Sequence, residues 1–379
     1  MLYWLLYEKL RVILDISPFR VFGYVTARTM FASLTSLFLA IVLGPWVIRR
    51  LRDLNFGQSI REDGPQSHHK KAGTPTMGGL LILACTVGPT LLWADLSDTY
   101  VWIAMFGMLS YAVIGFIDDY AKVMNKRNLG LTARQKFGMQ LLVAALLTGV
   151  LAWMRYKHLY TTELNIPFVK SFRPDLLIHS LMSSPYTFPF AFIEFYLFVV
   201  FVVVGSSNAV NITDGLDGLA AGLMVIAGGA LTVLAFVGGH RELSQYLQIV
   251  RNPHSAELTI FCGSLTGASL GFLWWNAHTA DMFMGDVGSL SMGGAMGVVA
   301  ILIKQEVLLL FIGGVFVIEL LSVILQVGSF KMRKKRIFKM APIHHHFEAL
   351  GWQESKIIAR FWIAGLVLAL FALTTLKLR

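Results

Sequence analysis

Four short polar motifs interrupt the apolar stretches of this 379-residue sequence, and their side chains are of the kinds that bind divalent cations and phosphate groups. The motifs are Gly115-Phe-Ile-Asp118-Asp119-Tyr-Ala-Lys122, Asn208-Ala-Val-Asn211-Ile-Thr-Asp214-Gly-Leu-Asp217-Gly, Phe283-Met-Gly-Asp286-Val-Gly-Ser and Ala341-Pro-Ile-His344-His345-His346-Phe. Carboxylate oxygens are the ligands that Mg²⁺ prefers, and cationic side chains around them attract polyanions. The expected chemistry is phosphoryl transfer assisted by a divalent cation.

The adjacent pair Asp118 and Asp119 ends a long apolar run. If that run is a helix, the pair lies at its C-terminal end, where the helix dipole already disfavours anions, so the two carboxylates need a cation. One interpretation satisfies them with Lys122, one turn further on, and with solvent at the membrane interface. In the functional interpretation the pair binds Mg²⁺, or one member acts as base or nucleophile in phosphoryl chemistry.

The second motif has both a structural and a functional interpretation. Thr213 or Asp214 can cap the apolar segment that follows, with Asp217 as the acidic partner of a capping box. Capping does not explain Asn208 and Asn211, which stand among several glycines. Carboxamide groups and close backbone approach suit the recognition of a base edge or a sugar, so we expect this motif to contact a ligand.

Asp286 and the three histidines also leave two interpretations each. Asp286 opens an apolar run, so it can be a helix cap or a Mg²⁺ ligand, and Phe283 can be an interfacial aromatic or a platform for a planar heterocycle. Three consecutive histidines splay apart on a helix, so they do not form a zinc site by themselves. They follow Pro342 and the basic run 331–336. Imidazoles there can donate to phosphate oxygens near neutral pH. A solvated basic loop is the alternative, which explains the Lys and Arg residues but explains the histidines poorly.

The elements that position these motifs are membrane helices. The chain is 56% hydrophobic and 14% charged, with a mean hydropathy of +0.64, whereas soluble proteins carry roughly 25% charged residues. The apolar runs are continuous over about 20 residues, which favours helices over the alternating strands of a β-barrel. Cys85 and Cys262 both fall inside apolar runs, so neither a disulfide framework nor a cysteine metal site is expected.

The apolar runs predict an all-α integral membrane protein with about ten transmembrane helices in a single domain, 1–379. We place the spans near 22–48, 76–94, 99–120, 134–156, 190–207, 216–237, 256–276, 288–303, 307–330 and 357–376. Residues 1–16 are too charged to span and predict an interfacial helix, with no removable signal peptide. The proline-rich connection 157–189 is expected to hold a short strand pair or a surface helix.

The distribution of positive charge predicts the orientation. Loops after the odd-numbered spans hold 19 of the 32 Lys and Arg residues, against 12 on the opposite face, so the odd loops are expected in the cytoplasm and both termini in the periplasm. All four motifs follow odd-numbered spans. The two odd loops that lack Lys and Arg hold Asp214, Asp217, Asp281 and Asp286. The active site is therefore expected on the cytoplasmic face, with a carboxylate floor inside a basic rim.

Together with Gly73-Thr-Pro-Thr76-Met-Gly-Gly79, the motifs resemble the phospho-N-acetylmuramoyl-pentapeptide transferase family, over essentially the whole chain from Tyr24 to Arg379. The resemblance implies an enzyme of peptidoglycan synthesis in the bacterial inner membrane. It would transfer phospho-MurNAc-pentapeptide from UDP-MurNAc-pentapeptide to undecaprenyl phosphate, giving lipid I and UMP, and would require Mg²⁺. It also implies a homodimer that nucleoside antibiotics inhibit, with no nucleic-acid partner.

The resemblance assigns roles residue by residue. Asp286 would lead the Mg²⁺ ligands, with Asp118 and Asp119 beside it and Asp118 deprotonating the lipid phosphate. The donor-binding set would comprise Phe283 stacking on uracil and the uridine-facing residues Lys71, Thr76, Asn208, Asn211, Asp214 and Asp217. The phosphate contacts would be Lys122, Lys136, His344, His345 and His346, with His345 foremost and Gln326 adding a further contact.

Two other functions share some of these features. A polyprenyl-phosphate N-acetylhexosamine-1-phosphate transferase would have the acidic motifs, but the segment Ala341-Pro-Ile-His-His-His-Phe-Glu348 favours the muramoyl-pentapeptide donor. A lipid or nucleotide-sugar transporter would show repeat symmetry and helices broken at mid-membrane, whereas these motifs lie at span ends on one side. Arg28, Glu194 and Glu319 lie within spans, where a buried pair or an oligomer contact explains them as well as a function does.

Overall fold

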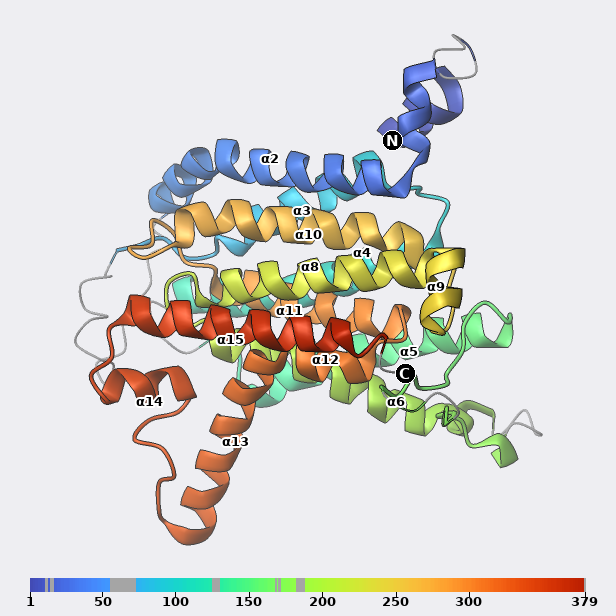
Figure 1. Ribbon diagram of the computed structural model, residues 1–379. Helices are drawn as coiled ribbons and strands as arrows, with labels where there is room; N and C mark the ends of the chain where they lie inside the picture. Colours follow the sequence, from blue (N-terminus) through green and yellow to red (C-terminus); the bar gives the residue numbers. More distant parts are fainter. Residues whose placement is uncertain are drawn as a thin grey trace.

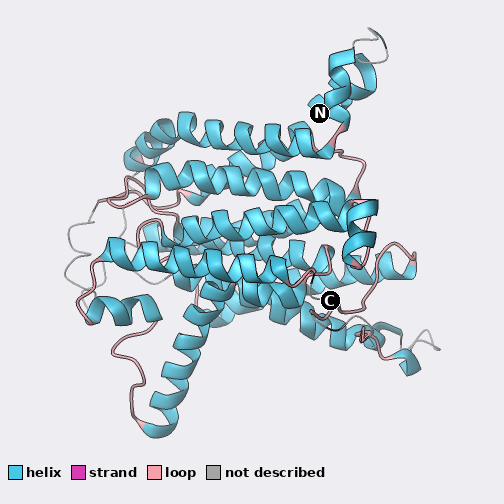
Figure 2. Ribbon diagram, in the orientation of Figure 1, coloured by secondary structure: helices cyan, strands magenta, loops and turns pink. Residues whose placement is uncertain are grey.

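The computed structural model describes residues 1–10, 13, 17–54, 73–124, 130–167, 169, 172–181 and 188–377. Every regular element in these ranges is a helix, as Figures 1 and 2 show. A long apolar segment inside a bilayer has no water to satisfy its peptide groups, and a helix satisfies them within the segment itself. The prediction of an all-α integral membrane protein is confirmed.

Nine helical segments in the described ranges are long and apolar enough to cross a membrane. They are α2 (Val25–Asp53), α4 (Thr99–Met124), α5 (Ala133–Tyr156), the run Phe190–Thr213, α8 (Leu219–Gly239), α10 (Ser255–Asn276), α11 (Gly285–Leu302), α13 (Gly314–Arg333) and α15 (Glu354–Thr374). The run Phe190–Thr213 joins η5 (Phe188–Phe192), α6 (Ile193–Val199), η6 (Val200–Val204) and α7 (Gly205–Thr213). Each of the nine overlaps a predicted span.

The remaining predicted span, 76–94, corresponds to a shorter apolar helix, α3 (Gly79–Trp93). Its 15 residues rise about 22 Å, less than the roughly 30 Å of a hydrocarbon core. The helix begins late because the backbone N–H groups of Gly78 and Gly79 donate to the carbonyls of Phe283 and Met284, both at 2.8 Å. The preceding residues are thereby paired with the loop before α11. Both chain ends lie at the same end of the bundle (Figure 1).

Two predicted boundaries differ from the structure in ways that affect the site. The helical run predicted over 190–207 continues to Thr213, so the asparagines of the second motif lie on α7 and not in a loop. The span predicted over 307–330 is interrupted at Gly313, between α12 (Glu306–Ile312) and α13. After this break α13 leaves the bundle at an angle (Figure 1). An apolar run alone does not reveal such an interruption, because both halves are equally hydrophobic.

The N-terminal segment and the connections are mostly short helical turns. Within the predicted interfacial helix 1–16, the described part forms η1 (Trp4–Leu10), followed by η2 (Ser17–Gly23). The connection over 157–189 contains η4 (His179–Leu181) and one isolated bridge between Glu163 and Asp175 in place of a strand pair. Further short helices are α9 (Arg241–Leu247) and α14 (Ile343–Ala349).

The core of the bundle is formed by α10 and α11. Gly263, Gly267 and Gly271 of α10 face Ser33 and Ala40 of α2 at intervals of four residues, so the two backbones approach closely. This is the small-residue packing that holds membrane helices together where lipid removes the hydrophobic drive for association. α11 packs against α3, α4, α7 and α8. Its first turn therefore meets the ends of several neighbouring helices.

Candidate active site at one end of the bundle

The end of α4 and the start of α11 approach closely enough to bring two motifs together. A Cβ added at Gly115 would lie 2.2 Å from the backbone oxygen of Asp286, so only glycine permits this contact. One turn further along α4, Asp119 Oδ2 accepts a hydrogen bond from the Val287 N–H at 3.1 Å. An acceptor at the first turn of α11 is favourable because peptide N–H groups point outward there.

Three carboxylates converge at this point. Asp118, Asp119 and Asp286 each offer an oxygen atom, and the three atoms lie within 4.8 Å of one another. The side chains of Asp118 and Asp119 are each 5% exposed, whereas the Asp286 side chain is 16% exposed. An octahedral Mg²⁺ with oxygen ligands at about 2.1 Å places those oxygens roughly 3 to 4 Å apart. The residues therefore fit a hard divalent cation, and Asp286 is the ligand most open to solvent.

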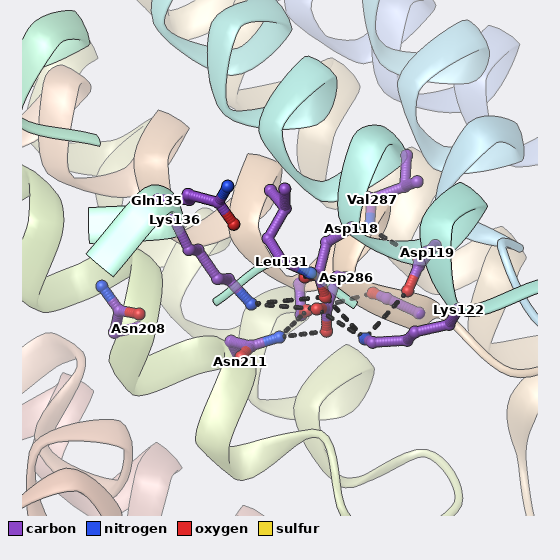
Figure 3. Close-up of polar contacts among 12 residues, drawn as sticks. Asp118, Asp119, Lys122, Leu131, Gln135, Lys136, Asn208, Asn211, Asp286 and Val287 are labelled. Carbon is purple, nitrogen blue, oxygen red and sulfur yellow. Dashed lines mark hydrogen bonds and ion pairs between the residues drawn. The ribbon is translucent and has the colours of Figure 1, made fainter. Parts of the chain in front are cut away.

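Two lysines complete the charge balance of this cluster (Figure 3). Lys122 Nζ lies 2.7 Å from Asp118 Oδ2, 2.8 Å from Asp286 Oδ2 and 3.3 Å from Asp119 Oδ1. Lys136 Nζ lies 2.9 Å from Asp286 Oδ2. Three carboxylates against two ammonium groups leave a formal charge of −1. The lysines can therefore neutralise phosphate while the carboxylates retain affinity for a cation.

The start of α5 is fixed by local sequence, and this places Lys136. Thr132 forms a capping box with Gln135, in which the Thr132 side chain accepts from the Gln135 N–H and the Gln135 side chain accepts from the Thr132 N–H. The preceding Leu131 N–H donates to Asp118 Oδ1 at 2.7 Å. The α5 N-terminus is thus tied directly to the carboxylate cluster.

The two asparagines of the second motif have different surroundings (Figure 3). Asn211 Nδ2 donates to Asp286 Oδ1 at 2.7 Å and to Ser289 Oγ at 2.8 Å, so it belongs to the cluster. Asn208 Nδ2 donates to Gln140 Oε1 at 2.9 Å and joins α7 to α5. Sequence reasoning gave no role to Gln140, although a lone polar side chain within an apolar span is the signal that could have indicated one.

The capping interpretations of the acidic residues are wrong. The residue before α8 is Gly218, and no side chain caps that helix; Asp214 instead follows the end of α7. α11 has no side-chain cap either, and Asp286 lies in its first turn with its carboxylate on the lysines. Burial, followed by repulsion from the Asp286 and Asp119 carboxylates, raises the pKa of Asp214 to about 8.

Asp217 belongs to a second group that includes two residues missed by sequence reasoning. His278 Nδ1 lies 3.6 Å from Asp217 Oδ2 and 3.7 Å from Glu354 Oε2. One atom of each residue falls within a 4.8 Å group that could also hold a cation. Glu354 begins α15, where an acidic residue is ordinary. Its sequence position therefore gave no signal of this contact.

Phe283 and Thr76 lie at the border of the cluster. The Phe283 N–H donates to the Pro75 carbonyl at 2.8 Å, and the side chain is half-buried. Thr76 Oγ1 would lie 3.1 Å from a Cβ placed on Gly285, next to the first turn of α11. Lys71, predicted beside them, lies outside the described residues.

The three histidines lie on α14 and face different partners. His344 is fully buried, with Nδ1 3.1 Å from Glu319 Oε2 of α13. His345 Nδ1 is 2.5 Å from Glu348 Oε2, and His346 Nδ1 accepts from the Lys339 N–H at 3.1 Å. A Cβ at Gly215 would lie 2.4 Å from His344 Nε2, so the fourth motif packs against the second. The ring centres of His344 and His345 lie 4.2 Å apart, so the predicted splaying of consecutive histidines is wrong for this pair.

Gln326, predicted to contact substrate, binds backbone in this structure. Its Oε1 accepts from the Ile337 and Phe338 N–H groups at 2.9 and 3.0 Å. Its Nε2 donates to the Phe338 carbonyl at 2.9 Å. The side chain therefore holds the segment that leads from α13 to α14.

Comparisons with known proteins show which family the chain is similar to. The family model described as "Glycosyl transferase family 4" matches residues 101–304, and "Phospho-N-acetylmuramoyl-pentapeptide-transferase signature 1" matches residues 71–83. A curated protein of Solibacter usitatus named phospho-N-acetylmuramoyl-pentapeptide-transferase is 67% identical, with 100% of each chain covered. Proteins of the same name from Koribacter versatilis and Desulfatibacillum aliphaticivorans are 62% and 54% identical. The match to the Koribacter protein covers 100% of each chain, and the match to the Desulfatibacillum protein covers 95% of this chain and 96% of the relative.

Proposed function

The chain belongs to the phospho-N-acetylmuramoyl-pentapeptide transferase family, and from this premise we propose the reaction in detail. The protein is a multi-pass membrane protein and a phosphosugar transferase of peptidoglycan precursor synthesis. The proposed donor is UDP-MurNAc-pentapeptide and the proposed acceptor is undecaprenyl phosphate. The products are lipid I and UMP, and Mg²⁺ is the cofactor.

The convergence of Asp118, Asp119 and Asp286 with Lys122 and Lys136 carries this proposal. Attack by a phosphate anion on a diphosphate brings like charges together, so the site has to supply positive charge where negative charge accumulates. When bound, Mg²⁺ would supply Lewis-acid stabilisation of the diphosphate oxygens. The two lysines approach Asp286 from different helices, so their ammonium groups can hold phosphate oxygens on two sides of the reacting centre.

Asp118 is assigned as the base that keeps the lipid phosphate ionised. Its Oδ1 is held by the Leu131 N–H, while Oδ2 faces Lys122 and the shared centre. This arrangement leaves one oxygen directed toward the reacting groups and fixes the orientation of the other. Asp286 is assigned as the leading metal ligand because it is the most exposed of the three carboxylates.

Residues beside the carboxylates are assigned to the nucleotide. Phe283 would stack on uracil, with Thr76 next to it and Asn211 reaching Asp286 from α7. At neutral pH, Asp214 with its pKa of about 8 is mostly protonated, so it can donate a hydrogen bond to a uracil carbonyl. Asp217 extends this surface toward His278.

The remaining residues predicted to bind substrate are assigned less direct roles. Asn208 would act through Gln140, and Gln326 through the backbone of 337–338. His344, His345 and His346 would lie on the phosphate side, and Lys71 would complete the uridine surface.

The proposed topology follows from the positions of the ends and of the site. We count α3 as a tenth crossing, because two ends on the same side of a bundle require an even number of passages (Figure 1). The basic loops then place the site in the cytoplasm and both termini in the periplasm of an inner-membrane protein. A soluble nucleotide donor and a lipid phosphate meet only at such a face. We further propose a homodimer that nucleoside antibiotics inhibit.

Purified protein in detergent, with UDP-MurNAc-pentapeptide, undecaprenyl phosphate and Mg²⁺, is expected to release UMP. EDTA should stop the release, and excess Mg²⁺ should restore it. Consumption of UDP-N-acetylglucosamine in place of the muramoyl donor would instead assign the related N-acetylhexosamine-1-phosphate chemistry. Absence of UMP with fresh lipid and metal would overturn the proposed reaction.

A further inference from the structure

One face of α13 carries polar side chains within an otherwise apolar helix. Glu319, Ser322, Gln326 and Ser329 follow at intervals of three, four and three residues, which place them on one side of the helix. Apolar side chains on other faces are open, as Ile324 is at 55% exposure. Polar groups in a membrane helix are costly unless they find partners. The polar face therefore indicates a specific partner along its length.

The main partner of this face is the chain segment that returns from α13 to α14, whereas Ser322 Oγ donates to the Glu319 carbonyl of its own helix at 2.7 Å. Ser329 Oγ donates to the Lys335 carbonyl at 2.8 Å. One turn earlier on α13, Gln326 accepts from the N–H groups of Ile337 and Phe338 and donates to the Phe338 carbonyl. As the chain advances from 335 to 338, its contacts move back along the helix. The segment thus lies antiparallel to α13 and is held in one register.

Glu319 is the last contact of this series and the only acidic one. Its carboxylate is fully buried and lies 3.1 Å from His344 Nδ1, which is also fully buried. Within the described part of the chain, neither carboxylate oxygen has a hydrogen-bond partner, so the imidazole is the group that compensates its burial. A carboxylate beside Nδ1 favours a proton on that nitrogen.

His344 also packs against the second motif. Its Nε2 would lie 2.4 Å from a Cβ on Gly215, so the ring packs directly against the backbone between Asp214 and Asp217. Its ring centre lies 4.2 Å from that of His345. A displacement of His344 would therefore move both the triple-histidine segment and the loop that carries the two aspartates.

We propose that Glu319 is a positioning residue for the transfer reaction. It holds the His344 ring against Gly215. It also makes the last contact of the antiparallel register between α13 and the segment that leads into the three histidines. This inference rests on the proposed function, because the reaction is what the positioned groups serve. Glu319 is fully buried and lies outside the group of Asp118, Asp119 and Asp286, so its effect is assigned to its contact with His344. A shift of about 1 Å in such groups costs on the order of 100-fold in rate.

The test compares Glu319→Ala, Glu319→Gln, His344→Ala and the double variant Glu319→Ala/His344→Ala. UMP release gives kcat and the KM for the donor, and hydrogen exchange reports on residues 334–349 in the same preparations. The control is Glu194→Gln, which changes an exposed glutamate of another apolar helix. Glu319→Ala should lower kcat about 100-fold and accelerate exchange in this segment. Glu319→Gln, whose amide oxygen can keep the polar contact with Nδ1, should remain within about fivefold of the parent protein.

The double variant separates positioning from a general loss of stability. If Glu319 acts through His344, the double variant should be no slower than the slower single variant, because coupled residues are not additive. The inference is overturned if the rate losses of the two single variants multiply in the double variant. It is also overturned if Glu319→Ala leaves kcat and hydrogen exchange unchanged. If Glu319→Ala fails to fold, the cycle is run with Glu319→Asp, whose shorter side chain withdraws the carboxylate from Nδ1; unchanged kcat and exchange, or multiplying losses, again contradict the inference. If the parent protein releases no UMP, only the proposed reaction is refuted. Hydrogen exchange over residues 334–349 still decides whether Glu319 positions this segment.

Discussion

Replacing Asp286 by asparagine tests the central feature of the site. The carboxylate lies 2.8 Å from Lys122 Nζ and 2.9 Å from Lys136 Nζ, and it shares a 4.8 Å group with Asp118 and Asp119. Asparagine has nearly the same shape but no charge. The substitution therefore removes a metal ligand and a counter-charge without leaving a cavity.

The expected effect on stability is small because opposing terms nearly cancel. At an effective dielectric constant of about 20, opposite charges 2.8 Å apart attract by about 6 kcal/mol, and like charges no more than 4.8 Å apart repel by at least about 3.5 kcal/mol. Two attractions and two repulsions leave at most about 5 kcal/mol in favour of Asp286. The desolvation of one buried ion costs several kcal/mol, so folding should change by no more than about 2 kcal/mol.

The expected effect on the rate is much larger. Loss of one electrostatic contact that acts in the transition state costs about 4 kcal/mol, which is on the order of 1,000-fold in kcat. The assay is UMP release over a Mg²⁺ titration, with thermal unfolding as the measure of folding. Asp281→Asn is the matched control, because Asp281 is an exposed aspartate of the same loop. An Asp286→Asn protein with more than a tenth of the parent kcat and the same Mg²⁺ dependence would refute the reasoning.

Four further substitutions test other contacts of the site. Gly115→Ala should lower kcat by at least tenfold and the free energy of unfolding by about 1–3 kcal/mol in thermal unfolding, because its Cβ would lie 2.2 Å from the Asp286 backbone. Parent-like values of both would contradict the close approach of the two helices. Because burial raises the folded-state pKa of Asp214 to about 8, its protonation stabilises the fold at low pH, and this stabilisation is lost as pH rises from about 4 to 8. Asp214→Asn should therefore gain melting temperature relative to the parent between pH 5 and 8 in metal-free buffer, and a constant difference would exclude the shift. Asn211→Ala should lower kcat about tenfold, whereas Asn208→Ala should mainly lower the melting temperature; equal effects of the two on kcat would argue against their different partners.

Much of the fold could be predicted from the sequence because a bilayer imposes simple rules. Continuous apolar runs require helices, and nine of the predicted spans correspond to long apolar helices of the structure. Interruptions inside apolar sequence were not predictable, such as Gly313 between α12 and α13. The late start of α3 was hidden as well, since it depends on hydrogen bonds to residues more than 200 positions away.

The candidate site shows the same division. Asp118, Asp119 and Asp286 were identifiable because carboxylates at the ends of apolar runs need compensation, and the structure brings them together. Their partners were less visible. Asp286 meets residues 164 and 150 positions away in the chain, and neither separation leaves a local pattern.

Sequence by itself determined the class of this protein, the ends of the bundle where polar side chains gather, and the identity of its motifs. Only the tertiary structure decided which of those side chains touch. It assigned Asn211 to the carboxylate cluster and Asn208 to a helix contact, and it buried His344 against Glu319. The physical reason is that hydropathy acts on each segment alone, whereas contacts between segments depend on where small residues such as Gly115 and Gly215 let backbones and rings approach.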